Sequence, residues 1–487
     1  MFVNYRLPHN VKLLPRSRID LMLFVKKTRF WLFIALLALS PLSKFPYLLI
    51  PNMSFTSFRF GFYQLLALTF VLFCLPPLLA KLKSLFWQNK IAFSSALVIL
   101  AILPINLLFD VDIKRGALFS ASIVMLIALA ASGWWFVSFG LPKKENHRII
   151  RIILTAGIVF GLLSLLEFLL LTLTDVKSSI ICNGCYASIF GFPRINLFAA
   201  EPQFLANAML PFLFVSLGSL LRHKTNLSTY CLALSTLTIS LTFSRGAYLA
   251  LLVGLAAFFM YLISVKKLVI KVFYTALFII VTAFLVGWLM LVWSAHYRHN
   301  LTPNITYNTV DTMLDHATLG LIDLPAKKLP ETENVKDDGF VPPGLISSSN
   351  TDRTTAATLA LNSWNTNIKT ILLGAGSGNL GPFTVKHVYT NAPYDLTVYI
   401  YYILLLAEIG LLGLAAFLLI YLSALQKLVK QKTTSSSAVV FGSVFALTIA
   451  FLIQYWFFGT FINNVYIWLW LGVALGLSAH FKTKKAI

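Results

Sequence analysis

The stretch TLTISLTFSRGAYLALLVG, residues 236–254, decides what kind of fold the chain adopts. Two apolar runs meet within it at Ser244-Arg245-Gly246, and each is close to the length that crosses a bilayer. A charged arginine at mid-bilayer costs roughly 2.5–3.5 kcal/mol even on the mildest scale, so Arg245 must lie at the end of a span or line a wet cavity. Gly246 lets the backbone turn directly after it. Two interpretations stay open: a short turn with a snorkelling arginine, or an anion-binding arginine at the membrane surface.

The composition of the whole chain predicts a polytopic membrane protein. Of its 487 residues, 58% are hydrophobic and 11% are charged, whereas soluble domains carry about 25% charged residues. The net charge of +22 comes from 39 basic and 17 acidic residues. In a soluble protein such an excess indicates nucleic-acid binding. Here the basic residues stand in short clusters between apolar runs, so we expect the lipid bilayer, and no nucleic acid, as a partner.

About twelve apolar runs are near the ~20 residues with which a helix crosses about 30 Å of hydrocarbon. Because the bilayer offers the backbone no water, and the alternation of barrel strands is absent, we predict an all-α fold of membrane helices. The predicted spans are about 30–50, 58–80, 92–109, 116–141, 150–173, 204–221, 227–243, 247–265, 272–294, 396–424, 436–458 and 464–481. Nine of them fill residues 30–294 and three fill residues 396–481.

The distribution of basic residues predicts the orientation. If the basic segment 1–29 is cytoplasmic, then it and the other segments on its side hold 25 of the 39 Lys and Arg residues. The positive-inside rule therefore places both termini, including the basic tail 482–487, in the cytoplasm. Arg245 and two larger segments, residues 174–203 and 295–395, then lie on the outer face.

The large external loop, residues 295–395, is long enough to form a small domain. Within it DRTTAATLALNSW, residues 352–364, predicts a short amphipathic helix capped by Asp352. LLGAGSGNLG follows at residues 372–381. A glycine run of this kind can bind phosphate through its backbone amides, but it lacks the lysine of a P-loop, and a flexible turn is the competing interpretation.

Several of these motifs together resemble the bacterial O-antigen ligase and O-antigen polymerase family. In order they are TFSRGAYLALL at 242–252, LGAGSGNLG at 373–381 and LLLAEIGLLGL at 404–414. Upstream, GFPRINLFAAEPQFLA at 191–206 resembles the external segment before the family's sixth span. The resemblance covers roughly residues 180–425.

The resemblance implies a metal-independent, GT-C-like glycosyltransferase on the outer face of the bacterial cytoplasmic membrane. It implies a donor glycan on undecaprenyl pyrophosphate, a glycan or lipid acceptor, and no cofactor, in the synthesis of lipopolysaccharide or another cell-surface polysaccharide. The Glu201-Pro202 pair is more typical of polymerases, but ligase and polymerase both stay open.

Three arginines are the candidates for holding the lipid pyrophosphate as it leaves: Arg194, Arg245 and Arg353. The planar guanidinium binds phosphate through two hydrogen bonds and stays charged. Fixed positive charge where negative charge develops typically supplies several kcal/mol of transition-state stabilisation. For each of the three, the competing interpretation is an ordinary surface arginine.

A general base is needed to take the proton of the acceptor hydroxyl. Ligases of this family carry a His-Asn pair eleven residues before the first glycine of the AEIGLLG stretch, and counting back from Gly410 reaches Tyr399 instead. The remaining candidates are His387 and Glu201, the latter as a carboxylate near Arg194, while Tyr399 is a candidate for positioning the acceptor.

Two carboxylates and two cysteines have more than one interpretation. Glu167 and Glu408 stand inside apolar runs, where a carboxylate is expensive and often functional; neutral protonation or pairing with a buried polar group is the alternative. Cys182 and Cys185 fall in an external segment, as a local disulfide or as free thiols.

His296 and His299 lack a third ligand, so we predict no metal site.

A different class of function also fits the many spans. A multi-span transporter or lipid-linked glycan flippase is the alternative to an enzyme. Such proteins usually have repeated halves with broken helices, and we find no internal repeat here.

Overall fold

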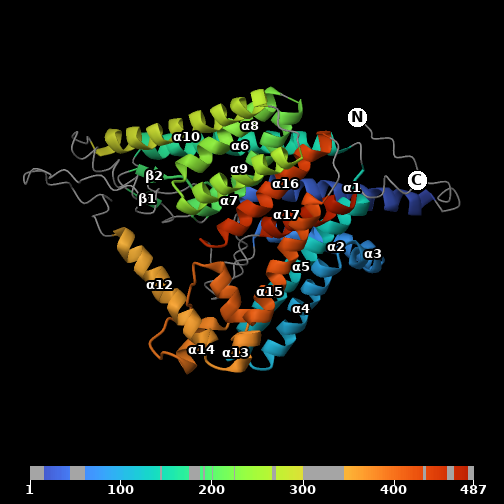
Figure 1. Ribbon diagram of the computed structural model, residues 1–487, viewed down its shortest axis with the longest axis vertical. Coiled ribbons are helices and arrows are strands. Elements are labelled where there is room, and N and C mark those ends of the chain that lie inside the picture. Colours follow the sequence, from blue (N-terminus) through green and yellow to red (C-terminus); the bar gives the residue numbers. More distant parts are fainter. Residues whose placement is uncertain are drawn as a thin grey trace, which may run out of the picture.

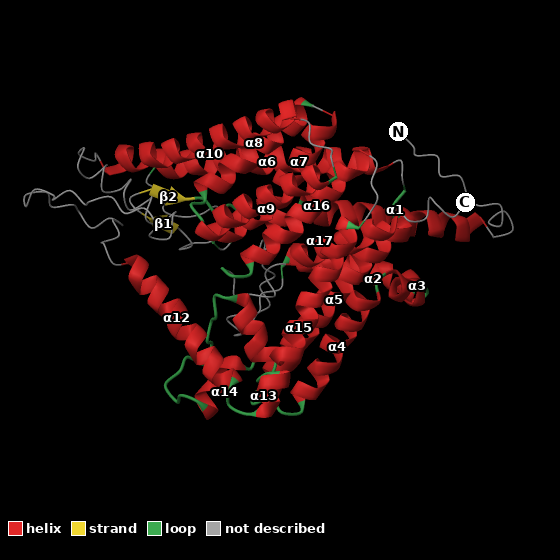
Figure 2. Cartoon of the chain, in the orientation of Figure 1, coloured by secondary structure: helices red, strands yellow, loops and turns green. Residues whose placement is uncertain are grey.

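The computed structural model describes residues 16–43, 61–142, 145–174, 187–189, 192–199, 201–223, 225–265, 270–299, 345–430, 435–457 and 465–480. Within these ranges the fold is helical, with one antiparallel hairpin formed by β1 (Ala187–Ile189) and β2 (Phe192–Arg194) (Figure 2). The all-α prediction is confirmed to that extent.

Eight described helices are long and apolar enough to cross a membrane. They are α2 (Phe62–Leu79), α4 (Lys90–Leu107), α5 (Ile113–Trp135, extended by a π-helical turn to Gly140), α6 (Asn146–Leu173), α7 (Pro202–His223), α9 (Arg245–Ser264), α10 (Ile270–His299) and α15 (Tyr401–Val429). Four more helices lie at the other predicted span positions: α1 (Arg16–Ala38), α8 (Asn226–Leu241), α16 (Ser435–Gln454) and α17 (Val465–His480). Short helices are α3 (Leu82–Gln88), α13 (Ile368–Leu373) and α14 (Leu380–His387), and α12 (Leu345–Trp364) is longer but polar.

Two predicted helix starts differ from the observed starts by more than five residues. The first span was predicted at 30–50, whereas α1 begins at Arg16 and ends at Ala38, because Lys and Arg favour a helix although they lower its hydropathy. The helix predicted to start at Asp352 begins at Leu345, so Asp352 lies inside α12 and is not its cap. Residues 345–352 include no proline or glycine, so nothing in this segment prevents the helix from beginning before Asp352.

Helix α7 is the central helix of the bundle. It packs against α6, α8, α9 and α10 on one side and against α16 on another (Figure 1). Helices α16 and α17 separate it from the group of α4, α5 and α15. In α7, 89% of the most apolar stretch is buried inside the protein, whereas in α10 only 22% of the corresponding stretch is buried. A helix that is buried all round, as α7 is, is expected at the core of a large helical protein.

The predicted outer segments contact one another. A hydrogen bond joins Arg194, from the segment before α7, to Thr242, between α8 and α9. An ion pair joins Arg115, at the start of α5, to Asp395, just before α15. In Figure 1 the hairpin and helices α12, α13 and α14 lie to the left and bottom of the bundle, away from α3 at the right. These contacts agree with the predicted alternation of the spans.

The glycine run docks onto a kink in α15. Gly374 has φ 84° and Gly410 has φ 68°, and a Cβ on Gly410 would lie 2.3 Å from the carbonyl carbon of Leu372. Only glycine tolerates so close a backbone approach at positive φ. The amides of Ala375 and Gly376 donate to carbonyl oxygens of α15 at 2.7 and 3.0 Å. Because those amides are already bonded, the interpretation of the run as a phosphate cradle is wrong.

Candidate functional site

Arg194 is the centre of the candidate site. It ends β2, and its Nε donates to the carbonyl oxygen of Thr242 at 2.9 Å. Burial lowers the pKa of Arg194 to about 10, and the charges of Arg245 and Arg353 lower that pKa further, while Glu201 opposes them. Two guanidinium groups from distant parts of the chain therefore act on that of Arg194 through space.

The backbone on both sides of this contact is strained. Among the described residues, the non-glycine residues with positive φ are Leu197 at 45° and Phe243 at 47°. Leu197 lies three residues after Arg194, and Phe243 directly follows the carbonyl that Arg194 binds. Phe243 also packs edge-on against Phe192 of the hairpin, at 5.3 Å between ring centroids. Such backbone outliers cost about 1–3 kcal/mol each and gather at functional sites.

Arg245 is positioned as the first residue of α9. Ser244 is the N-cap residue with extended backbone, and Gly246 lies against Phe457, so that a Cβ there would come 2.7 Å from the Phe457 side chain. Gln203, in the first turn of α7, donates to the Phe457 carbonyl oxygen at 2.6 Å. The segment after α16 therefore packs between the starts of α7 and α9.

Arg353 reaches the site from the polar helix α12. Its guanidinium carbon lies 5.1 Å from the centroid of the Tyr399 ring, which is a cation–π distance. Tyr399 is 38% exposed, and it precedes α15, whose first amide, that of Tyr401, donates to Tyr455 O at 2.8 Å. Tyr399 thus supports an arginine.

The two candidate bases have different surroundings. Glu201 is exposed, directly precedes α7, and acts electrostatically on Arg194. His387 is the last residue of α14, also exposed, and its ring lies 4.5 Å from that of Phe383. The interactions described for His387 include none with the three arginines, so the structure brings Glu201 and not His387 to this site.

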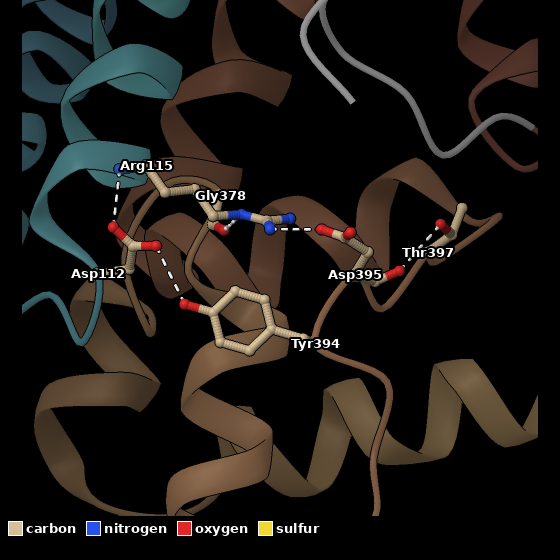
Figure 3. A network of polar contacts seen from close by, with 6 residues as sticks. All are labelled: Asp112, Arg115, Gly378, Tyr394, Asp395 and Thr397. Atoms are coloured by element: carbon tan, nitrogen blue, oxygen red, sulfur yellow. Dashed lines mark hydrogen bonds and ion pairs between the residues drawn. The ribbon is translucent and has the colours of Figure 1, made fainter. Parts of the chain in front are cut away.

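A polar network that the sequence did not indicate joins α5 to the chain before α15 (Figure 3). Arg115 Nε donates to Gly378 O at 2.6 Å, and its guanidinium pairs with Asp395. Asp112 caps α5 by accepting from Arg115 N at 3.0 Å, and Tyr394 OH donates to its other oxygen at 3.0 Å. The bond from the Arg115 amide is the main cause that lowers the pKa of Asp112. An acidic residue before an apolar run signals the cap; nothing in the sequence signals partners some 280 positions away.

Asp110 is a second polar feature beside the glycine run. Its carboxylate lies between Gly116 and Gly376, where a Cβ on either glycine would come within 1.8 Å of an Asp110 oxygen. Burial raises the pKa of Asp110 to about 7, although Lys369 opposes this. Burial in turn lowers the pKa of Lys369, whose Nζ donates to Gly374 O at 2.7 Å.

Both carboxylates inside apolar runs bind backbone amides. Glu408 receives the amide of Gly378, which fixes the end of the glycine run on α15. Glu167 Oε2 receives the amide of Leu197 at 2.8 Å. Within the described part of the chain, no three His, Cys, Asp or Glu side chains are grouped to hold a metal ion. Cys182 and Cys185 lie outside the described residues.

Comparison with known proteins adds no relative: no family model and no curated protein matches the chain.

Proposed function

We propose that this chain is a membrane glycosyltransferase that transfers or polymerises a glycan carried on a polyprenyl pyrophosphate such as undecaprenyl pyrophosphate, at the outer face of the cytoplasmic membrane. The observation that supports it most is the gathering of Arg194, Arg245 and Arg353 at one end of an apolar helix bundle. Like charges repel, so folding brings three guanidinium groups together only at a cost. A dianionic or trianionic group bound among them offsets that cost.

The proposed reaction uses this positive charge on the leaving group. The acceptor hydroxyl oxygen attacks the anomeric carbon of the donor sugar, and the bond from that carbon to the phosphate oxygen breaks. The bonding electrons move onto the pyrophosphate, where the arginines stabilise them. The acceptor proton passes to a base, for which the exposed Glu201 is our candidate because it lies near Arg194.

An aromatic ring supports Arg353. Arg194 donates to a backbone carbonyl, Arg245 is the first residue of α9, and Arg353 lies over the ring of Tyr399. We assign Tyr399 the role of a positioning residue, because its ring fixes the guanidinium and the residue is partly exposed beside it.

Reconstitution in vesicles with a polyprenyl-pyrophosphate-linked glycan tests the proposal. The wild-type chain is expected to form transferred product, as a ladder if it is a polymerase and as a single addition if it is a ligase. Arg245→Ala should lower turnover about 100-fold or more, as loss of a major charge-stabilising group does. Arg222→Ala is the matched control, since Arg222 is an exposed arginine near the opposite end of α7.

The outcomes separate the alternatives. Unchanged turnover in Arg245→Ala would remove the central role assigned to the arginines. Movement of intact lipid-linked glycan across the vesicle, without transfer, would support a flippase instead. Protease access to tags at either terminus from outside the cell would contradict the proposed orientation.

A further inference from the structure

We infer that Glu167, a carboxylate buried in the membrane helix α6, is a positioning residue that holds the turn carrying Arg194. The inference rests on the proposed function for its catalytic consequence, but its structural part does not depend on that function. The family resemblance does not indicate it, and the contacts described for Glu167 include none with the arginines themselves.

The turn that follows Arg194 is tight and strained. The amide of Ala199 donates to Asn196 O at 2.7 Å, which closes a four-residue turn with Leu197 as its second residue at φ 45°. The left-handed region is unfavourable for leucine, because its Cβ crowds the following carbonyl oxygen. The side chains of Asn196 and Leu197 are nearly fully buried, so water does not satisfy this backbone.

Glu167 supplies the bonds that the turn lacks. Its Oε2 accepts the amide of Leu197 at 2.8 Å, and the carboxylate also accepts the amide of Asn196. Hydrogen bonds to a carboxylate are stronger than those between neutral groups. Two such bonds are sufficient to hold a leucine in an unfavourable conformation.

The held turn fixes Arg194 from one side, and Thr242 fixes it from the other. Ile195 and Asn196 directly follow Arg194, and both are buried. The guanidinium then meets the carbonyl of Thr242, next to the second strained residue, Phe243. Glu167 therefore controls one of the two ends between which Arg194 is held.

A purely structural role would not require a carboxylate at this position. The neighbouring buried positions of α6 are uncharged, with Ser164, Phe168, Leu171 and Thr172 among them, and a leucine at 167 would avoid the cost of a buried charge. Glu167 Oε1 has no hydrogen-bond partner within the described residues, which adds to that cost. The residue is explained by the backbone amides that its carboxyl group receives, that of Leu197 on Oε2 and that of Asn196.

A cysteine-accessibility experiment tests the structural part without measuring transfer. Ala199→Cys is introduced after Cys182→Ser and Cys185→Ser, and labelling by a membrane-impermeant maleimide is timed in the full chain. The thiol introduced at position 199 is expected to label slowly with Glu167 present, at a similar rate in Glu167→Gln, and several-fold faster in Glu167→Leu. Ala360→Cys, at a buried position of α12 outside this turn, is the control that detects general unfolding. Equal labelling rates of the introduced thiol in all three backgrounds would overturn the inference.

The transfer assay tests the catalytic part. Glu167→Leu should lower turnover about 10- to 100-fold, as a small displacement of a catalytic group does, while Glu167→Gln, which keeps an acceptor oxygen, stays within about threefold. In an Arg194→Ala background Glu167→Leu should add less than about twofold, since groups acting as a unit are not additive.

The experiments distinguish failure of the positioning role of Glu167 from failure of the proposed function. Faster labelling with full turnover in Glu167→Leu, or additive losses in the double variant, would overturn the positioning role. Absence of transfer by the wild-type chain would refute the proposed function and leave the labelling result to decide the role of Glu167 in the turn.

Discussion

Replacing Gly410 by alanine should destabilise the protein more than any ordinary glycine-to-alanine change in a helix. The residue lies inside α15 with φ 68° and ψ −176°, a backbone region that is essentially restricted to glycine. It faces the glycine run closely enough that the two backbones share hydrogen bonds.

The expected loss in free energy of unfolding is about 3–5 kcal/mol. The backbone conformation alone costs an alanine about 1–3 kcal/mol. The new Cβ would lie 2.3 Å from the carbonyl carbon and oxygen of Leu372, and these backbone atoms cannot rotate away as a side chain can. Moving the run outward breaks the bonds that Ala375 and Gly376 donate to α15, worth about 1 kcal/mol each.

Thermal and denaturant unfolding of the purified protein in detergent measures this loss. Gly133→Ala is the matched control: its Cβ would lie 3.2 Å from a Leu469 methyl and 3.3 Å from the Leu469 carbonyl oxygen, which a small shift relieves, and alanine favours the helix by up to about 1 kcal/mol. We expect the control to remain near wild type. A Gly410→Ala protein as stable as the control would refute the docking of the glycine run on α15.

Three further predictions concern stability and transfer. Burial raises the pKa of the Asp110 carboxyl from 3.8 to about 7, so between pH ~4 and ~7 this group binds more protons in the folded state than in the unfolded state, and stability falls as pH rises through that window. Asp110→Asn should therefore make the thermal midpoint less dependent on pH across that range. An unchanged pH dependence of the midpoint would assign the effect to another group. Tyr399→Ala removes the ring beside Arg353 and should lower the rate of transfer about 2- to 30-fold, whereas Tyr399→Phe keeps the ring and should keep the rate. Equal losses in the two variants would assign the effect to the hydroxyl group. Arg115→Ala removes both the ion pair with Asp395 and the hydrogen bond to the Gly378 carbonyl, and should lower the free energy of unfolding by about 2 kcal/mol. Asp395→Ala removes only the ion pair and should lower it by less than about 1 kcal/mol. The reverse order in denaturant unfolding would contradict the network.

Hydropathy predicts the helices because burial in lipid depends on local composition alone. A helix stands at every predicted span position, and α4, for example, runs from 90 to 107 where 92–109 was expected. The prediction fails at α1, where basic residues lower the hydropathy of a segment that remains a good helix former. A threshold on hydropathy cannot detect this.

The site was only partly visible in the sequence. Arg245 stands out because charge is rare beside apolar runs, whereas Arg194 and Arg353 were candidates through the family resemblance, and the structure places Arg245 and Arg353 within electrostatic reach of Arg194. The glycine run was misinterpreted, since a sequence shows which residues permit positive φ but not that Gly374 faces Gly410. Partners far apart in the chain have no local signature.

Phe457 has a consequence for how the protein matures. It lies against Gly246 and accepts a hydrogen bond from Gln203, so one wall beside Arg245 comes from a residue synthesised more than two hundred positions later. A nascent chain released before that point carries all three arginines and lacks the wall beside them. The wall beside Arg245 is therefore complete only after Phe457 has been synthesised.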